Sequence, residues 1–348
     1  MSTRRLLTAL GTAACALTLA AAVPMFGAPS ALAAGKTIDW SKVPEAKTVL
    51  FYPGQASFEW IQTGTDHGGA RSFTKKGETC SGCHAEETAD MGKKMVTGQK
   101  IEPTVIPGKR ASIPLKVKAA YDADTLYMRF EFPAGPHNDA PNATGGKMDP
   151  DNEVKLALMI DDGKVEAADR SGCWASCHAD AHDMPSAPAT DKLAAIKGID
   201  TSGGYVTKYL PESRTAVSLK DEPRGGWDKL KSQAELDALL KEGKFLDLAR
   251  FKSGKGGQSE DGYVLAERVL KQNAGATFTG KKEGDAWVVT MTRKLNSGQP
   301  GDHVLQPGKS YTVGFAVHDD YARGRFHHVS LNLRLGLDAD GDIKAVKQ

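Results

Sequence analysis

The chain has 348 residues, and its 45 Lys and Arg residues nearly balance 43 Asp and Glu residues, for a formal net charge of +2 at pH 7. This balance argues against a protein that binds nucleic acids through a basic surface, so we expect no nucleic-acid partner. The 37 glycines, 17 prolines and modest apolar content favour a loop-rich, mainly β architecture over a helical bundle.

Residues 1–33 predict an export signal. The basic pair Arg4-Arg5 precedes a long apolar, Ala-rich run, and Ala31-Leu32-Ala33 fits the small-x-small pattern that signal peptidase cleaves. An uncleaved membrane anchor is the alternative, although the run is near the lower length limit for spanning a bilayer. We therefore expect a periplasmic protein from which the signal peptide has been removed.

Residues 34–108 are expected to form a small N-terminal lobe. A strand is predicted over residues 48–52, where Pro53-Gly54 would end it, and a helix over residues 86–95. Between these two elements stands the most specific motif of the lobe, Cys80-Ser81-Gly82-Cys83-His84.

This motif predicts covalent attachment of a c-type haem. Two cysteines about one helical turn apart can bond neighbouring vinyl edges of one porphyrin, and the next histidine then falls near the iron. The alternatives are a dithiol redox pair and half of a zinc site, which would need a second Cys/His pair at matching spacing. We predict that Cys80 and Cys83 carry the haem and that His84 is the proximal ligand of its iron.

The pattern changes to alternating apolar and polar residues after residue 109. Residues 114–121 and 126–132 both alternate, and the Asp-Ala-Asp turn at 122–124 joins them into a predicted hairpin. A third strand is predicted over residues 153–160, shortly before a second cysteine motif.

The second motif, Cys173-Trp174-Ala175-Ser176-Cys177-His178, has three residues between its cysteines instead of two. A structural disulfide is the alternative in an exported protein. Four of the five cysteines fall in the two motifs and Cys15 falls in the leader, so no cysteine is left over. We predict a second covalent haem on Cys173 and Cys177, with His178 as its proximal ligand, giving two haems c in all.

The rest of the chain predicts a β-sandwich over residues 109–348. Strands are expected over residues 276–279, 287–292, 311–318 and 329–335. Residues of about 180–260 show few strand signals and one helix over 232–241, so we expect an insertion there. The Asp-rich segment 338–342 lacks the glycine position and the glutamate of a calcium loop, and a hairpin turn is expected instead.

The sixth ligand of each iron decides between electron transfer and chemistry on a substrate. His67 is a candidate because it lies thirteen residues before Cys80 in a glycine-rich loop that can fold over the opposite haem face. His327 is a candidate because on a strand it shares a face with Val329 and Leu331, so its ring should point into the apolar interior.

Three further residues rank lower as distal ligands. His328 is in phase with the outward set of its strand, although one bulge would exchange it with His327. His318 and Met184 are also possible, but a buried methionine usually fills space in a core.

Three segments carry a family resemblance: Leu50-Phe51-Tyr52-Pro53-Gly54, Asp66-His67-Gly68-Gly69-Ala70 and the second cysteine motif with Gly172 before it. On these residues the chain resembles the dihaem c-type branch of the haem-binding domain found in ethylbenzene dehydrogenase gamma subunits and related subunits of the dimethyl sulfoxide reductase group. The resemblance implies a β-sandwich that holds haem between strands. Gamma subunits bind haem non-covalently through methionine and lysine, whereas here Phe326-His327-His328-Val329-Ser330 stands where a lysine-bearing strand would be expected.

These observations favour a periplasmic dihaem protein that transfers electrons between respiratory partners. The resemblance implies a molybdenum oxidoreductase as one partner, and a membrane quinol-oxidising complex is another candidate. The competing hypothesis is a haem enzyme that reduces peroxide or a nitrogen oxide at one open haem, and a third is a haem-based sensor or a structural subunit. No catalytic residue is assigned.

Overall fold

The computed structural model describes residues 37–103, 105, 107–136, 149–181, 184–185, 187–196, 201, 210–220, 226–272 and 274–348. The expected leader, residues 1–33, lies outside the described residues. Residues Ile38–Gln348 form one compact unit. No helix within the described ranges is both long enough and apolar enough to cross a bilayer.

The protein is mainly β, which confirms the predicted fold class. The strands are β1 (Ala46–Phe51), β2 (Ser112–Tyr121), β3 (Thr125–Pro133), β4 (Lys155–Asp161), β5 (Leu246–Lys252), β6 (Gln258–Val264), β7 (Arg268–Gln272), β8 (Ala276–Glu283), β9 (Ala286–Lys294), β10 (Lys309–His318), β11 (His328–Val329), β12 (Leu333–Leu337) and β13 (Ile343–Lys347). They form one sheet in the order β7-β6-β5-β4-β10-β11-β1-β2-β3-β9-β8. β12 pairs with β10, and β13 pairs in parallel with both β12 and β2.

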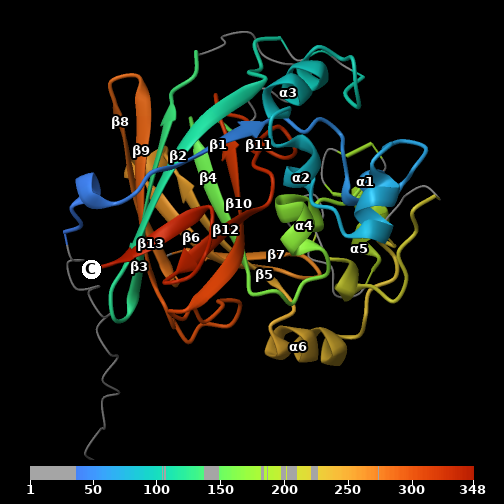
Figure 1. Ribbon diagram of the computed structural model, residues 1–348. Coiled ribbons are helices and arrows are strands. Elements are labelled where there is room, and N and C mark those ends of the chain that lie inside the picture. The colour runs from blue at the N-terminus through green and yellow to red at the C-terminus, as the bar shows by residue number, and fades with distance from the viewer. Residues whose placement is uncertain are drawn as a thin grey trace, which may run out of the picture. The chain divides into compact units, whose positions relative to one another are not determined.

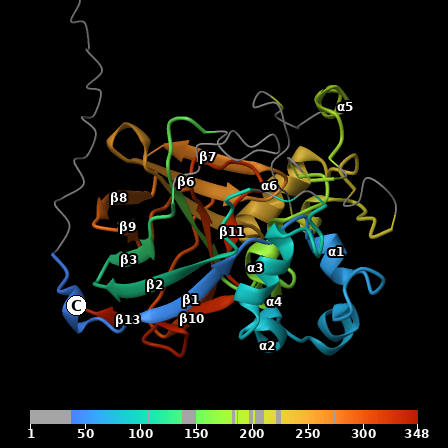
Figure 2. The ribbon, with the colours of Figure 1, turned by 90° about the horizontal axis from the view of Figure 1, so that it is seen from above.

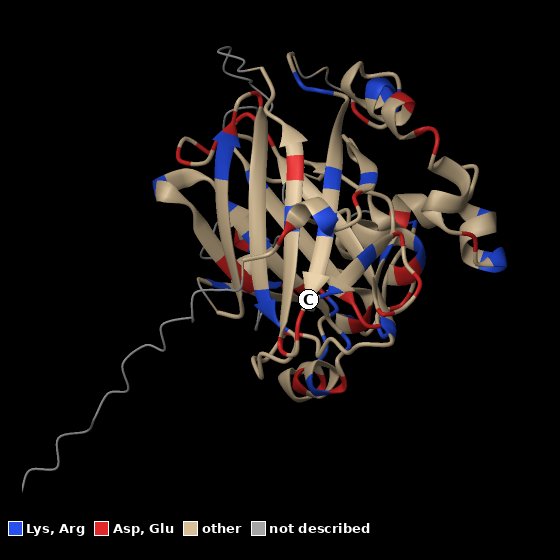
Figure 3. Ribbon diagram, turned by 60° about the vertical axis from the view of Figure 1, so that its left-hand side comes forward, with Lys and Arg blue, Asp and Glu red and all other residues tan. Residues whose placement is uncertain are grey.

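The sheet folds over so that its two ends face each other as the layers of a sandwich (Figure 1 and Figure 2). The Phe278 amide of β8 donates a hydrogen bond of 2.7 Å to the Ser259 hydroxyl of β6, which joins the two layers near their edges. Alternation along β2 turns Leu115 and Val117 inward, and the rings of Phe130 and Phe315 meet across the core at 5.7 Å. In Figure 3 the charged residues form short bands on strands that are otherwise tan, as expected of strands that bury one face and expose the other.

Short helices and irregular segments cover one side of the sheet (Figure 1). The helices are α1 (Phe58–Gln62), α2 (Cys80–His84), α3 (Thr88–Val96), α4 (Ala168–Ser171), α5 (Thr190–Ala194) and α6 (Gln233–Glu242), and the 3-10 and π turns are η1 (Trp40–Lys42), η2 (Ser72–Lys76), η3 (Gly172–Ser176), η4 (Pro211–Ser213) and η5 (Gly254–Gly256). Although about 90 residues separate α2 from α4, the two helices are in contact. The fold thereby brings both cysteine motifs to the same side of the sheet.

Three expectations about the strands and their connections are wrong. β5 and the start of β6 lie within the stretch of about 180–260 expected to be an insertion, yet β5 pairs with β4 along six residues. The alternation of β5 is hard to see in the sequence because Asp247, a buried polar residue, interrupts it. The strand expected over 329–335 is divided into β11 and β12, and residues 338–342 connect the parallel strands β12 and β13 instead of forming a hairpin.

Candidate haem sites

The first cysteine motif forms the five-residue helix α2. Thr79 begins the helix, since its hydroxyl accepts a hydrogen bond of 2.8 Å from the Gly82 amide. At the end of the helix, Nδ1 of His84 lies 2.9 Å from a carboxylate oxygen of Glu87, one turn further along the chain. A histidine that donates Nδ1–H to a carboxylate presents Nε2 to a metal, so Glu87 sets the ring in the form that a haem iron requires.

His67 faces this motif from the loop that follows α1. Its Nδ1 lies 2.8 Å from the Ile61 carbonyl oxygen, so it also presents Nε2, and its ring packs 5.2 Å from that of Trp60. The ring centroids of His67 and His84 are 6.1 Å apart. Two imidazoles that bind one metal from opposite sides, with bonds of about 2 Å, have centroids roughly 6 Å apart. The pair therefore fits the two axial positions of one iron.

A cavity of about 300 Å³, here called the first cavity, adjoins this pair. It is lined by Phe51, Ala56, Trp60, Ile61, Asp66, His67, Gly68, Cys80, His84, Glu87, Met91, Lys94, Met95, Lys100, Ile101, Trp174 and Leu331. Burial and the neighbouring Cys83 raise the pKa of the Cys80 thiol to about 12. Cys83 itself is exposed and lies outside the lining.

The second cysteine motif follows α4 and folds as the 3-10 turn η3. The turn starts at Gly172, whose backbone has φ of 55° and passes so close to Asn332 that a Cβ would come within 3.1 Å of it. Glycine therefore suits this position on two grounds. Trp174 points inward and donates a hydrogen bond of 3.0 Å from Nε1 to the Ala56 carbonyl oxygen.

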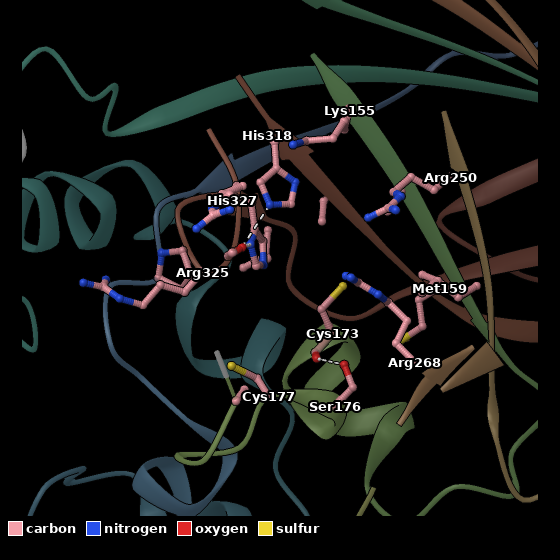
Figure 4. A pocket seen from close by; sticks show the side chains of 18 of the residues that line it. Lys155, Met159, Cys173, Ser176, Cys177, Arg250, Arg268, His318, Arg325 and His327 are labelled. Atoms are coloured by element: carbon pink, nitrogen blue, oxygen red, sulfur yellow. Dashed lines mark hydrogen bonds between the residues drawn. The ribbon is translucent and has the colours of Figure 1, made fainter. Parts of the chain in front are cut away.

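Cys173 and Cys177 open onto a cavity of about 350 Å³, here called the second cavity. It is lined by Pro53, Gly54, Asp149, Pro150, Lys155, Ala157, Met159, Cys173, Trp174, Ser176, Cys177, Ala181, Met184, Leu246, Leu248, Arg250, Lys252, Val264, Arg268, Gly314, Ala316, His318, Arg323, Gly324, Arg325, His327 and Val329. Its volume lies in the range typical of cofactor pockets. In Figure 4 the two cysteines lie on one side of it and His318 and His327 on the other.

His318 and His327 form a pair within the second cavity, with ring centroids 4.8 Å apart. Both rings donate to the same acceptor, because His318 Nε2 and His327 Nδ1 each lie 2.9 Å from the Gly324 carbonyl oxygen. Burial and the proximity of His327 hold the pKa of His318 well below its ordinary value. His318 is therefore neutral at pH 7, which is the form that ligates a metal.

His178 lies beside the second cavity and is not among its lining residues. Its side chain is fully buried, its ring is 6.2 Å from that of Phe58, and its Nδ1 is paired with the equally buried Glu59. Burial alone would raise the pKa of Glu59, but the charge and hydrogen bond of His178, helped by the Ala179 amide at 3.1 Å, lower it. With Nδ1 engaged by Glu59, Nε2 is the nitrogen that would reach an iron.

Basic side chains dominate the charged part of the second cavity. Six basic residues line it, namely Lys155, Arg250, Lys252, Arg268, Arg323 and Arg325, against the single acid Asp149. A haem carries two propionate groups, and arginine and lysine are the side chains that pair with carboxylates. Four of these groups are paired with carboxylates, namely Lys155 with Asp149, Arg250 and Lys252 with Glu260, and Arg325 with Glu102. The lining is thus apolar around the cysteines and rich in basic groups elsewhere, which suits an amphipathic, anionic porphyrin.

Two lower-ranked ligand candidates have different surroundings. Met184 is buried and lines the second cavity. His328 was expected to face outward, but it is fully buried, with Nε2 2.8 Å from the Arg110 carbonyl oxygen and Nδ1 3.3 Å from Asp319. The outward expectation fails because β11 ends at Val329 and the loop at Lys109 and Arg110 covers this position.

Sequence reasoning missed the roles of three residues: Trp174 and Asn332, which connect the two motifs, and Glu59, which pairs with His178. Among the described residues, Trp174 alone lines both cavities, and it also packs 5.4 Å from Phe51. The side chain of Asn332 accepts a hydrogen bond of 3.0 Å from the Ser81 amide in α2 and donates one of 3.1 Å to the Asp169 carbonyl in α4. The position of Trp174 inside a motif was a usable signal, whereas nothing in the sequence marks Glu59 or Asn332.

Comparison with known proteins identifies relatives of the whole described unit. A family described as ethylbenzene dehydrogenase matches residues 37–286 and 261–330, which confirms the family that the sequence resembles. Cytochrome c-552 of Stutzerimonas stutzeri is 44% identical over 330 residues, covering 94% of this chain and 96% of that protein. Cytochrome c-551 of Rhodocyclus tenuis is 33% identical over 312 residues, covering 89% and 99%.

Among solved structures, a family 9 carbohydrate-binding module from Caldicellulosiruptor kristjanssonii in complex with glucose is 12% identical, covering 63% of this chain and 66% of that chain. The TM-score of 0.23 is too low for this likeness to bear on the function.

Proposed function

The chain belongs to the family described as ethylbenzene dehydrogenase, and from this membership we propose that it is a periplasmic dihaem cytochrome that passes electrons between redox proteins. As a c-type cytochrome of this family it is an electron-transfer haem protein. The observation that carries the dihaem proposal is the pair of cavities, each of which receives cysteine from a different motif and histidine from a separate segment.

The first haem is assigned to Cys80 and Cys83, with His84 and His67 as its axial ligands. The facing rings and the two Nδ1 contacts support this assignment, because both histidines are already oriented with Nε2 available. Two strong protein ligands leave no exchangeable position on the iron, which suits electron transfer.

The second haem is assigned to Cys173 and Cys177. His178 is proposed as its proximal ligand because it adjoins Cys177, and His327 as its distal ligand because it lies across the second cavity from the cysteines. His318, 4.8 Å from His327, is the alternative, and Met184 and His328 rank below it.

Bound haem supplies an iron that alternates between the ferric and ferrous states, so each site takes up one electron and later releases it. The residues of the chain control this exchange. Glu87 and Glu59 hold the Nδ1–H groups of His84 and His178, the basic lining of the second cavity compensates carboxylate charge, and Trp174 fills the wall between the cavities with a packed aromatic ring.

The proposed location and partners rest on the sequence and on the family resemblance. The signal-like residues 1–33 support export, and covalent haem attachment to c-type cytochromes takes place after export. We propose redox proteins as partners, with a molybdenum oxidoreductase or a membrane quinol-oxidising complex as the candidates.

Removal of each cysteine pair tests the proposal. We expect Cys80→Ser/Cys83→Ser and Cys173→Ser/Cys177→Ser variants, matured with a cytochrome assembly pathway, to retain one covalent haem each. Intact mass and haem staining of the denatured protein measure the number. Two haems in either variant, or one in the wild type, would contradict the assignment.

A second measurement separates the electron carrier from the alternative of a haem enzyme that reduces peroxide or a nitrogen oxide. If both irons have two protein ligands, carbon monoxide leaves the spectrum of the reduced wild-type protein unchanged. His327→Ala and His318→Ala are then compared by electron paramagnetic resonance, and the variant that converts one iron to the high-spin state identifies the distal ligand. Rapid carbon monoxide binding by the wild type would instead favour the enzyme.

A further inference from the structure

Three acidic side chains meet inside the sandwich, away from both cavities. Asp247 comes from β5, Asp261 from the neighbouring strand β6, and Asp302 from the loop after β9. One carboxylate oxygen of each lies within 4.8 Å of the others. Asp247 and Asp261 have no exposed surface, and the Asp302 side chain is 2% exposed.

The hydrogen bonds available to these carboxylates do not satisfy them. One Asp247 oxygen accepts from the Arg293 guanidinium and from the His303 amide, and one Asp302 oxygen accepts from the Ser297 hydroxyl. The other oxygen of Asp247 and the other oxygen of Asp302 are buried without a hydrogen-bond partner among the described residues, and the buried Asp261 carboxylate has at most one donor, the Gly275 amide. Buried carboxylate oxygens rarely remain without a partner, and such a group indicates a bound water or ion.

The charges of the cluster are also out of balance. Three carboxylates surround one guanidinium, that of Arg293, whose side chain is fully buried. Burial raises the pKa of Asp247 to about 6, and burial together with the neighbouring Asp302 and Asp247 carboxylates raises the pKa of Asp261 to about 7. Three carboxylates and one guanidinium leave a net charge of −2 when ionised, which a cation with two positive charges would balance.

We propose that Asp247, Asp261 and Asp302 form a binding site for Ca²⁺. Calcium prefers oxygen ligands, takes six to eight of them and tolerates irregular geometry, whereas Mg²⁺ demands a near-ideal octahedron. Four carboxylate oxygens are available here, and water or backbone carbonyl groups would supply the remaining ligands. The ion would connect β5 and β6 to the loop after β9, and so would fasten the two layers of the sandwich.

A second acidic cluster differs from the first because the backbone of a turn supplies hydrogen-bond donors to its carboxylate. Asp161 lies close to Asp162 and His303. Its oxygens accept hydrogen bonds from the amides of Gly163, Lys164 and Val165, at 3.0 to 3.3 Å. The backbone therefore gives Asp161 three amide donors, whereas Asp261 has at most the amide of Gly275.

The test uses the haem-loaded protein after a chelator has removed free divalent cations. Its melting temperature is measured with and without millimolar Ca²⁺ at pH 8. At a calcium concentration about 100 times the dissociation constant, we expect the melting temperature to rise by about 4 °C. Asp261→Asn should abolish the rise and should melt above the metal-free wild type, because it removes an uncompensated buried charge. Asp340→Asn, in the exposed acidic segment 338–342, is the matched control and should retain the full rise.

Titration calorimetry on the wild type gives the stoichiometry, for which we expect one Ca²⁺ per chain. If Asp261→Asn does not fold, Asp302→Asn, which leaves the Arg293 to Asp247 pair intact, should lose this binding. No effect of Ca²⁺ on wild-type melting, an equal effect of Mg²⁺, or unchanged binding in the folded aspartate variants would overturn the proposal. Because none of these measurements depends on the number of haems, their failure is distinguishable from failure of the proposed function.

Discussion

The two cysteine motifs share their chemistry but differ in their surroundings. Around the first motif, Cys83 is exposed and Glu87, the partner of His84, is 61% exposed. Around the second motif, His178 and its partner Glu59 are both 0% exposed. The same Cys–His adjacency is thus presented by a surface helix in one case and by a turn against the core in the other.

The glutamate–histidine contact therefore has a different physical role at each motif. A carboxylate that water can reach orients its histidine at little cost and is screened by solvent. A buried carboxylate remains charged only because its partners stabilise it, so its removal affects the fold as well as the histidine. We therefore expect substitutions near the second motif to change stability more than matched substitutions near the first.

Trp174 gives the largest expected effect, because it belongs to the second motif but lines both cavities. Trp174→Ala should lower the free energy of unfolding by about 4 kcal/mol, the usual loss for a buried tryptophan. Trp60→Ala, at a half-buried ring that lines the first cavity alone, is the matched control and should cost about half as much. Denaturant unfolding measures both values.

Trp174→Phe separates packing from haem coupling. The smaller ring should restore much of the stability, and the electron paramagnetic resonance signals of both irons should match the wild type. If Trp174→Ala and Trp60→Ala lose equal unfolding free energy, the position of Trp174 between the two cavities adds nothing to stability.

The paired glutamates give the next largest effect. Glu59→Ala leaves a buried imidazole and the Ala179 amide without their acceptor, and should cost about 3 kcal/mol of unfolding free energy. Glu87→Ala removes an exposed partner and should cost less than about 0.5 kcal/mol. Denaturant titrations of the two variants test the difference, and similar losses would refute the contrast between the two regions.

The pH dependence of stability tests the ion pairs beside the second cavity, where Arg250 and Lys252 line the cavity and pair with Glu260. Burial raises the pKa of Glu260, but Arg250 and Lys252 lower it further, so its pKa in the folded protein is depressed. Its stabilising contribution is therefore present above the unfolded pKa of about 4.3 and is lost as the pH falls through the folded value.

Glu260→Gln should lose about 1 kcal/mol at pH 7 and should lose less stability than the wild type between pH 5 and pH 3. Thermal unfolding across this range measures the slope. Asp90→Asn, which breaks the exposed pair with Lys94 in α3, is the control and should leave the pH profile unchanged. If the unfolding free energies of Glu260→Gln and the wild type fall equally between pH 5 and pH 3, the ion pairs of Glu260 with Arg250 and Lys252 do not contribute to this pH dependence.

The sequence predicted those features that depend on local pattern. The hairpin of β2 and β3 followed from alternation, the helix expected over 232–241 is α6, and the family followed from the motifs. β5 and β6 were missed because acids that meet only in the folded protein, such as Asp247 and Asp261, obscure the alternation.

The partners of the motif residues could not be predicted for a similar reason. Glu59 lies 119 residues from His178, and no local signal records a contact over such a distance. The proximity of His67 to the first motif could be predicted because only thirteen residues separate it from Cys80.

Asn332 gives the smallest expected effect, yet it tests whether the two regions are coupled. Its side chain accepts from the Ser81 amide and donates to the Asp169 carbonyl, so it joins α2 to α4. Asn332→Ala should cost about 1 kcal/mol. Asn332→Asp keeps the acceptor for Ser81 and loses the donor to Asp169. If the two regions are coupled through this side chain, Asn332→Ala should reduce protection of the α2 amides from hydrogen exchange, and Asn332→Asp should retain most of it. Equal protection in both variants and the wild type would mean that the motifs keep their relative position through Trp174 and the backbone alone.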